Sequence, residues 1–153
     1  MTRQVIDVPR APGEAVPVAA EHRGTEGRDV TMTVHQDAVR RYFAAWNAGS
    51  AEELGKAVAA GFTEDATYTD PLADVRGHDG LAAAIGGAQE QFAGFDFVLT
   101  GTPDAHHHLV RFTWDLVSRA DGSSPAAGFD VIALAEDGRI SSVSGFLDRL
   151  PGA

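Results

Sequence analysis

The chain places an acid and a phenol two residues apart near its middle, in the stretch from Glu64 to Pro71. Side chains of an extended strand alternate between its two faces, so Ala66, Tyr68 and Asp70 share one face. A buried carboxylate without a cationic partner is costly, and many enzymes prepare a general base in this way. The alternative is structural, because an aspartate before a proline commonly begins a turn.

Two further side chains could act together with this pair. Tyr42 falls on the apolar stripe of an expected helix, where a buried hydroxyl needs a partner and can donate to a substrate oxygen. Asp130 interrupts the apolar run Gly128-Phe129-Asp130-Val131-Ile132, where a charge must be paired or protonated. Taken alone, Tyr42 is better explained as part of the core and Asp130 as a residue of the sheet rim. Their occurrence together favours a functional site.

Other catalytic chemistries find little support in the residues. There is no cysteine, which excludes thiol nucleophiles, disulfides and thiolate metal sites. Lys56 is the only lysine and lies in a stretch that reads as a polar helix face, which disfavours Schiff-base chemistry. Ser141, Ser142 and Ser144 lack the pattern of a nucleophile elbow.

The run His106-His107-His108 is the feature that would suggest a metal site. Only His106 and His108 could share a face, and the sequence places no acidic ligand beside them. Because a closed site needs three or four ligands, we expect no metal and no cofactor.

Charge and hydrophobic patterning limit the partners and the location. The formal net charge is -10, so the surface should repel phosphate backbones, and we expect no nucleic-acid partner. No apolar run is long enough for a membrane span, and the N-terminus lacks the pattern of a signal peptide. We therefore expect no membrane partner and a cytoplasmic location.

The length of 153 residues suits one domain. Residues 1–31 contain three prolines and no apolar periodicity, which predicts a disordered or flexible N-terminal extension. The domain is expected over residues 32–150, followed by a short tail at 151–153.

Three helices are predicted in the first part of the domain. A capping-box pattern at Thr33 opens the first, which ends at Gly49. A second capping pattern at Ser50 opens a helix that runs out at Gly61. The third follows the turn at residues 77–80 and carries apolar side chains at helical spacing.

From residue 95 onward the apolar pattern becomes that of strands, at 95–100, 109–117, 129–135 and 140–146. Turn signals between the last three predict a meander. This order predicts an α+β domain, with three N-terminal helices packed on a curled, cone-shaped, mixed or antiparallel sheet. Such a cone under a helical cover encloses a pocket.

Three parts of the sequence resemble a known family. They are Ala38 to Gly49, Glu64 to Pro71, and Asp130-Val131-Ile132 with Asp137-Gly138-Arg139-Ile140. These parts resemble the SnoaL-like and ketosteroid-isomerase-like branch of the nuclear-transport-factor-two-like superfamily, over about residues 34–150. In order and spacing, Tyr42 is similar to that isomerase's oxyanion-hole tyrosine, Asp70 to its general base, and Asp130 to its protonated oxyanion-hole acid.

The resemblance implies a small, cofactor-independent acid/base enzyme that acts on an apolar carbonyl compound. The reaction would be a double-bond isomerisation or an aldol-type cyclisation, with Asp70, Tyr42 and Asp130 as the catalytic residues. The substrate pocket would be formed by Trp46, Tyr68, Trp114, Val143 and Leu147.

Other functions remain open within the same resemblance. Similar residues occur in relatives that open epoxides, and the same cone could serve as a non-catalytic module that binds a hydrophobic ligand. The fold also commonly forms homodimers. Exposure of Val110, Phe112 or Phe146 on the outer face of the sheet would favour a dimer here.

Overall fold

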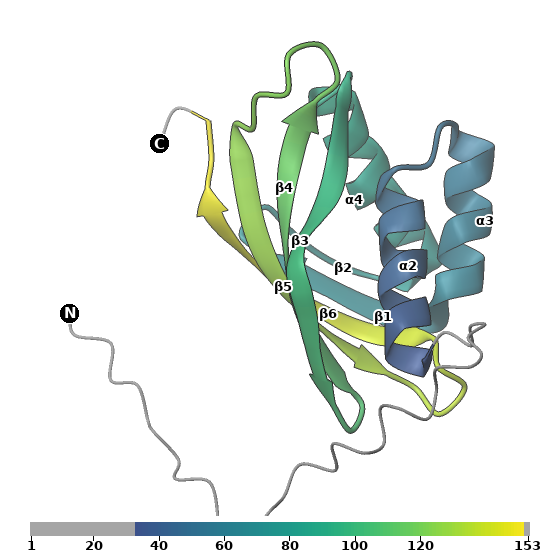
Figure 1. Ribbon diagram of the computed structural model, residues 1–153. Helices are drawn as coiled ribbons and strands as arrows, with labels where there is room; N and C mark the ends of the chain where they lie inside the picture. Colours follow the sequence, from purple (N-terminus) through teal and green to yellow (C-terminus); the bar gives the residue numbers. More distant parts are fainter. Residues whose placement is uncertain (1–32, 152–153) are drawn as a thin grey trace, which may run out of the picture. The chain divides into compact units, whose positions relative to one another are not determined.

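The computed structural model describes residues 33–151. The expected extension at residues 1–31 lies outside the described residues, as do the last two residues of the expected tail. The described part contains three helices and six strands. It has the predicted α+β architecture, with the helices on a curved sheet that is not closed (Figure 1).

The three predicted helices are confirmed, but residues 77–80, which were predicted to form a turn, are the first turn of the third helix. Their bounds are Val34–Trp46 for α2, Ala51–Gly61 for α3 and Gly77–Gln91 for α4. α2 begins with the predicted capping box, in which the Thr33 hydroxyl accepts a hydrogen bond from the Gln36 amide and the Gln36 side chain accepts one from the Thr33 amide. α3 begins at Ser50, whose hydroxyl accepts a hydrogen bond from the backbone of Glu53. Local capping therefore determines where the first two helices begin.

The strands form one mixed sheet in the order β2-β1-β6-β5-β4-β3. β1 runs parallel to β6, and every other neighbouring pair is antiparallel. The strands are β1 Phe62–Asp70, β2 Ala73–Arg76, β3 Phe95–His106, β4 Leu109–Ser118, β5 Ala126–Leu134 and β6 Ile140–Arg149. This order brings the end of β1 and the middle of β5 to opposite sides of the same strand, β6.

Two parts of the sheet differ from the prediction. β2 was not predicted, because its four residues are too few to show a period; it forms because the chain turns back after Asp70 and pairs with β1. β3 continues past Thr100 to His106. Its ladder with β4 shifts register between Thr100 and Asp104, where Gly101 adopts a φ of 65° that glycine reaches without strain.

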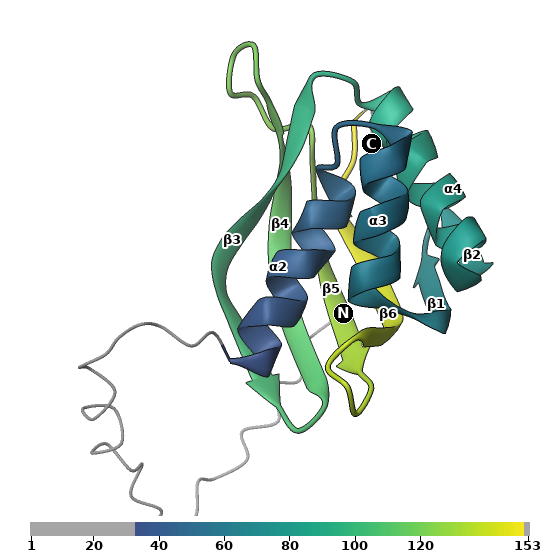
Figure 2. The same ribbon diagram turned by 90° about the vertical axis from the view of Figure 1, so that its right-hand side faces the viewer.

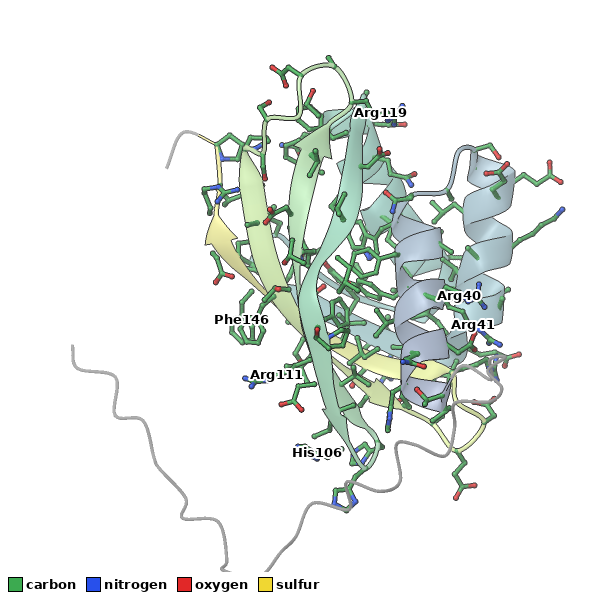
Figure 3. All side chains as sticks on the ribbon, in the orientation of Figure 1. Arg40, Arg41, His106, Arg111, Arg119 and Phe146 are labelled. Atoms are coloured by element: carbon green, nitrogen blue, oxygen red, sulfur yellow. The ribbon has the colours of Figure 1, made fainter. Side chains whose placement is uncertain are left out.

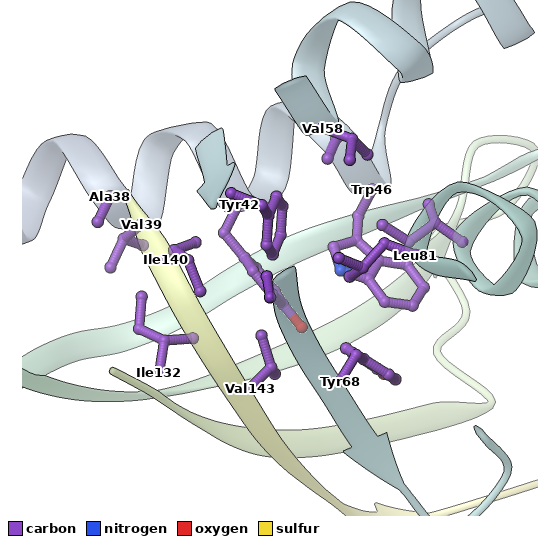
Figure 4. Packing of buried hydrophobic residues seen from close by; sticks show 14 of the residues in the cluster. Ala38, Val39, Tyr42, Trp46, Val58, Tyr68, Leu81, Ile132, Ile140 and Val143 are labelled. Atoms are coloured by element: carbon purple, nitrogen blue, oxygen red, sulfur yellow. The ribbon is translucent and has the colours of Figure 1, made fainter. Parts of the chain in front are cut away.

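The helices cover one face of the sheet, and the core lies between the two layers (Figures 1 and 2). Figure 4 shows side chains from both layers meeting there, among them Val58, Leu81, Ile132 and Ile140, each at most 1% exposed. Full burial of one such side chain contributes about 1.5–3 kcal/mol. This packing holds α2 and α4 in place over the inner face of the sheet. Among the helices described, none is long and apolar enough to cross a membrane.

Candidate active site

A cavity that is partly open to solvent lies between the helices and the inner face of the sheet. It is lined by both tyrosines and both tryptophans of the chain together with two acids, namely Tyr42, Tyr68, Trp46, Trp114, Asp70 and Asp130. The rest of the wall is apolar and includes Phe92, Phe97 and Leu147. A few polar groups in an apolar wall are typical of a site for a small organic molecule.

Asp70 ends β1 and uses its two carboxylate oxygens differently. Oδ1 accepts hydrogen bonds from the backbone amides of Leu72 and Ala73, both at 2.8 Å, and so holds the turn to β2. Oδ2 accepts a hydrogen bond from the Tyr68 hydroxyl at 2.5 Å. Asp70 accepts three hydrogen bonds in all, two at Oδ1 and one at Oδ2. It therefore both holds the turn and lines the cavity, and its catalytic role stays a prediction.

Tyr68 lies on the same inward face of β1 as Asp70, as predicted from the alternation of the strand. It is 4% exposed, whereas the neighbouring Thr69 is exposed. Burial and the hydrogen bond to Asp70 both raise the pKa of the Tyr68 hydroxyl, so this group stays protonated and acts as a donor.

Tyr42 and Asp130 form a second pair of the same kind. The Tyr42 hydroxyl, from α2, donates to Asp130 Oδ2, from β5, at 2.5 Å. Both residues are buried, with 2% and 3% exposure. Burial raises the pKa of Tyr42 well above its usual value, and the nearby Asp130 raises it further.

Asp130 is the acid that burial affects most. Desolvation raises its pKa to about 6, against the opposing hydrogen bond from Tyr42 and a further contribution from Trp114. The charge of Asp70 raises it as well. Below about pH 6, Asp130 is therefore mainly protonated and can donate a hydrogen bond.

A glycine separates the two carboxylates. Gly145 of β6 pairs directly with Asp130 of β5, and its other neighbouring strand, β1, places Asp70 beside it. A Cβ atom on Gly145 would lie 2.8 Å from Asp130 Oδ1 and 3.2 Å from Asp70 Cβ. The two acids thus lie in one row across three strands, and no side chain stands between them at the Gly145 position of β6.

A second glycine positions one of the tryptophans. A Cβ atom on Gly128 would lie 2.6 Å from the Trp114 ring, so the indole rests directly on the backbone of β5. Neither Gly145 nor Gly128 was identified as a site residue in the sequence. The available signal was a glycine at an inward position of a strand, which often marks close approach by another group.

Trp46 contributes an unusual polar group to the cavity. It ends α2, is 8% exposed, and packs against Tyr68 and Phe97 with ring centroids 5.8 Å and 4.8 Å away. Its indole nitrogen Nε1 is buried and has no hydrogen-bond partner.

Most of the residues expected in the pocket line this cavity, namely Trp46, Tyr68, Trp114 and Leu147. Val143 does not. It is 1% exposed and belongs to the hydrophobic core, because it pairs with Tyr68 and Ile132 at a position of β6 that lies beneath the helices. Within residues 33–151, no group of three or more His, Cys, Asp or Glu side chains is arranged to hold a metal ion.

The outer face of the sheet is less apolar than the dimer hypothesis required. Val110 and Phe112 are 1% and 3% exposed and belong to the core. Phe146 is 52% exposed and stacks on Phe129, with ring centroids 5.1 Å apart. Figure 3 shows Phe146 on the side of the sheet away from the helices.

Comparison with known proteins gives one match to a family model, described as a SnoaL-like domain, over residues 39–143. A proposed isomerase of the SnoaL-like family from Agrobacterium tumefaciens is 44% identical in sequence. The match covers 76% of this chain and 99% of that one, with a TM-score of 0.72. A search among curated proteins found no match.

Two more distant structures share the fold. A proposed polyketide cyclase from Sinorhizobium meliloti is 18% identical, with 71% of this chain and 93% of that chain covered and a TM-score of 0.57. An NTF2-like protein of unknown function from Exiguobacterium is 20% identical, with 72% and 98% covered and a TM-score of 0.57. At these identities the likeness concerns the fold alone.

Proposed function

Because the chain belongs to the SnoaL-like family of the nuclear-transport-factor-two-like superfamily, we propose that it is a cofactor-independent acid/base enzyme acting on a small apolar carbonyl compound. The observation that carries the proposal is the pair of Tyr–Asp hydrogen bonds facing one apolar cavity. Asp70 accepts three hydrogen bonds at the end of a strand, whereas Asp130 is buried beside one hydroxyl, and burial raises its pKa. Two acids in such different surroundings can take opposite roles in one reaction.

In the proposed reaction, Asp70 acts as the base. Its Oδ2, which accepts one hydrogen bond, removes a proton from the carbon next to the substrate carbonyl, since Oδ1 already accepts two from the turn. The C–H bond breaks and its electron pair forms a new C=C bond, while the π pair of the C=O bond moves to the oxygen, which gives an enolate. Asp70 then returns the proton at the conjugated position, so the double bond moves and no oxidant or reductant is needed.

Tyr42 and Asp130 would stabilise the enolate. Tyr42 stays protonated because burial raises its pKa, and Asp130 is mainly protonated below about pH 6. Both can therefore donate to the oxygen on which negative charge develops. In an aldol-type cyclisation, the same enolate would instead attack a second carbonyl of the same molecule.

The wall of the cavity indicates the substrate class. Its aromatic and aliphatic side chains favour an apolar molecule, and Gly145 leaves room for a flat segment between the acids. The side chains of Trp46, Tyr68 and Trp114 occupy much of the cavity. This favours a substrate with one or two rings over a substrate with a larger ring system.

The proposal can be tested with cyclohex-3-enone, whose isomerisation to the conjugated cyclohex-2-enone is followed by ultraviolet absorbance. We expect Asp70→Asn to lower kcat about 100-fold to 10,000-fold, the usual contribution of a general base. Asparagine keeps an oxygen for the Leu72 and Ala73 amides, so the turn survives. Asp70→Ala is less informative, because loss of these bonds would also destabilise the fold by about 1–3 kcal/mol.

Asp74→Asn is the matched control. Asp74 is an exposed acid of the neighbouring strand β2, bonded to the Thr69 hydroxyl at 3.0 Å, and does not line the cavity. Its substitution should leave turnover unchanged. Equal turnover by wild type and Asp70→Asn would remove Asp70 as the base. Ligand binding without any turnover by the wild type would instead indicate a non-catalytic binding module.

A further inference from the structure

We propose that Trp46 is a positioning residue that acts through Tyr42. When a ligand with an anionic oxygen binds, the Tyr42 hydroxyl donates to that oxygen instead of to Asp130. The indole N–H of Trp46 then donates a hydrogen bond to the Tyr42 oxygen. This inference rests on the proposed function. It adds a third donor, acting through Tyr42, to the end of the cavity that stabilises the enolate.

The first observation is that the indole N–H has no partner. Among the buried side-chain nitrogen and oxygen atoms of the described residues, Trp46 Nε1 alone lacks a hydrogen bond. A buried donor left unpaired costs about 1–3 kcal/mol, and native proteins contain few of them. An unpaired indole N–H is explained if it gains a hydrogen-bond partner when a ligand is bound.

The second observation is the direction of this group. In Figure 4 the nitrogen edge of the Trp46 indole faces the Tyr42 side chain, and the two ring centroids are 6.1 Å apart. Tyr42 uses its proton to bond Asp130, so its oxygen still has lone pairs that can accept a hydrogen bond. The indole N–H therefore faces a side chain whose oxygen can accept a hydrogen bond.

The third observation is that the indole is held firmly. Its ring packs between Tyr68 and Phe97, and the Gln89 side chain donates to the Trp46 carbonyl at 2.9 Å, which fixes the end of α2. A donor fixed in advance needs no reorganisation when charge develops nearby.

These observations lead to a relay of donors. When Tyr42 donates to an anionic ligand oxygen, electron density on the Tyr42 oxygen increases and that oxygen becomes a better acceptor. The Trp46 N–H can then bond it, and successive hydrogen bonds in a chain strengthen one another. The Trp46 N–H makes no hydrogen bond of normal geometry, but it lies close enough to Tyr42 to lower the pKa of that hydroxyl slightly, against the larger effect of burial.

The test uses 2-naphthol, a flat phenol whose anion resembles an enolate, and naphthalene, which has the same shape but no oxygen. Trp46→Phe keeps an aromatic ring at this position. It removes the N–H together with the five-membered ring of the indole. We expect it to weaken 2-naphthol binding about 10-fold or more, as for loss of a hydrogen bond to a charged group, and to leave naphthalene binding nearly unchanged. Equal weakening of both ligands would show that Trp46 only packs, and would overturn the proposal.

A double-mutant cycle tests whether Trp46 acts through Tyr42. In a Tyr42→Phe background the acceptor is gone, so adding Trp46→Phe should cause no further loss of 2-naphthol affinity. Additive losses would mean that Trp46 contacts the ligand directly, contrary to the proposal.

A measurement on the unaltered chain guards against a variant that fails to fold. The protein has two tryptophans, so a ¹⁵N spectrum contains two indole N–H signals, and Trp46→Phe or Trp114→Phe assigns them. Addition of 2-naphthol should move the Trp46 signal downfield, as expected when an N–H gains a hydrogen bond, whereas naphthalene should not. An unmoved Trp46 signal with 2-naphthol bound would overturn the inference alone. If naphthalene binds and 2-naphthol does not, the proposed anion site itself fails, and the inference fails with it.

Discussion

At the scale of single residues, the site depends on two carboxylates with opposite surroundings. Asp70 lies at the end of a strand and accepts three hydrogen bonds. Asp130 lies in the middle of a strand, is 3% exposed and has Tyr42 as its hydrogen-bond partner at Oδ2. Burial raises the pKa of Asp130 against the opposing hydrogen bond from Tyr42, so this acid holds its proton more tightly than an exposed aspartate.

The raised pKa of Asp130 predicts how stability depends on pH. Its pKa rises from 3.8 to about 6 on folding, so the folded chain holds this proton more tightly than the unfolded chain. The resulting stabilisation, about 3 kcal/mol, is fully present below about pH 4 and is lost as the pH rises through about 6. Urea unfolding of wild type and Asp130→Asn should therefore show a difference in unfolding free energy that changes by this amount between about pH 4 and pH 8.

The comparison with Asp130→Asn also removes the effects of other acids. Asp121 and Asp137, whose pKa values are lowered by hydrogen bonds within their turns, contribute with the opposite sign but equally in both proteins. A difference that stays constant with pH would contradict the assignment of Asp130 as the buried, protonated acid.

At the scale of elements, β6 is the strand that brings the site together. It lies between β1, which carries Tyr68 and Asp70, and β5, which carries Asp130. Because Gly145 has no side chain, the two acids can approach one another across this strand without a third group between them.

Substitution of this glycine should damage the site more than the fold. In Gly145→Ala the new Cβ would be 2.8 Å from Asp130 Oδ1, so Asp130 must move away from its position beside Tyr42. We expect turnover of cyclohex-3-enone to fall about 10-fold or more, since small misplacements at a site have large effects, and stability to fall by about 1–3 kcal/mol.

Gly55 in α3 provides the control for a glycine-to-alanine change. A Cβ on Gly55 meets nothing within 4 Å, and alanine is the better helix former by about 1 kcal/mol. Gly55→Ala should therefore raise the unfolding free energy slightly and leave turnover as it is. If Gly145→Ala turned over the substrate as fast as the wild type, the absence of a side chain between the two acids would not be needed for activity.

The sequence predicted the helices and most of the strands because each has a capping signature or a clear period. It did not predict β2, which is short, nor the pairing of β1 with β6, which joins segments far apart in the chain. The bulge in β3 hid the second half of that strand, since a register shift interrupts the alternation on which the prediction depends.

The same limit applies to the site. Tyr42, Asp70 and Asp130 could be proposed from residue type and strand alternation, and the fold places all three on one cavity. The position of Gly145 between the acids required the register of three strands. The unpaired nitrogen of Trp46 required the positions of all its neighbours, which no local pattern contains.

At the scale of the whole molecule, the two faces of the sheet are unequal. The inner face is covered by helices, whereas the outer face carries Phe146 (Figure 3), which stacks on Phe129. Val110 and Phe112 lie in the core, so Phe146, which is exposed and stacks on the partly buried Phe129, is the residue of the expected dimer contact that remains on this face. We propose a homodimer through this face that depends on Phe146.

This expectation can be checked by sedimentation. The wild type should sediment at twice the mass of one chain, and Phe146→Glu should sediment as a monomer, because a charge would then be buried in the contact. Val34→Glu is the matched control, since Val34 is also about half exposed, at 54%, but lies on α2 on the other side of the sheet. A dimer that persists in Phe146→Glu would place the contact elsewhere.

The double use of Asp70 affects how related sequences should be compared. A descendant that had lost its chemistry would still need an acceptor for the Leu72 and Ala73 amides, so selection for folding alone could keep an aspartate at this position. An asparagine would also serve the turn, but it could not remove a proton. Presence of Asp70 by itself is therefore weak evidence that a relative is active. The more telling mark is its presence together with Tyr42, Asp130 and an open position at Gly145, which the turn does not require.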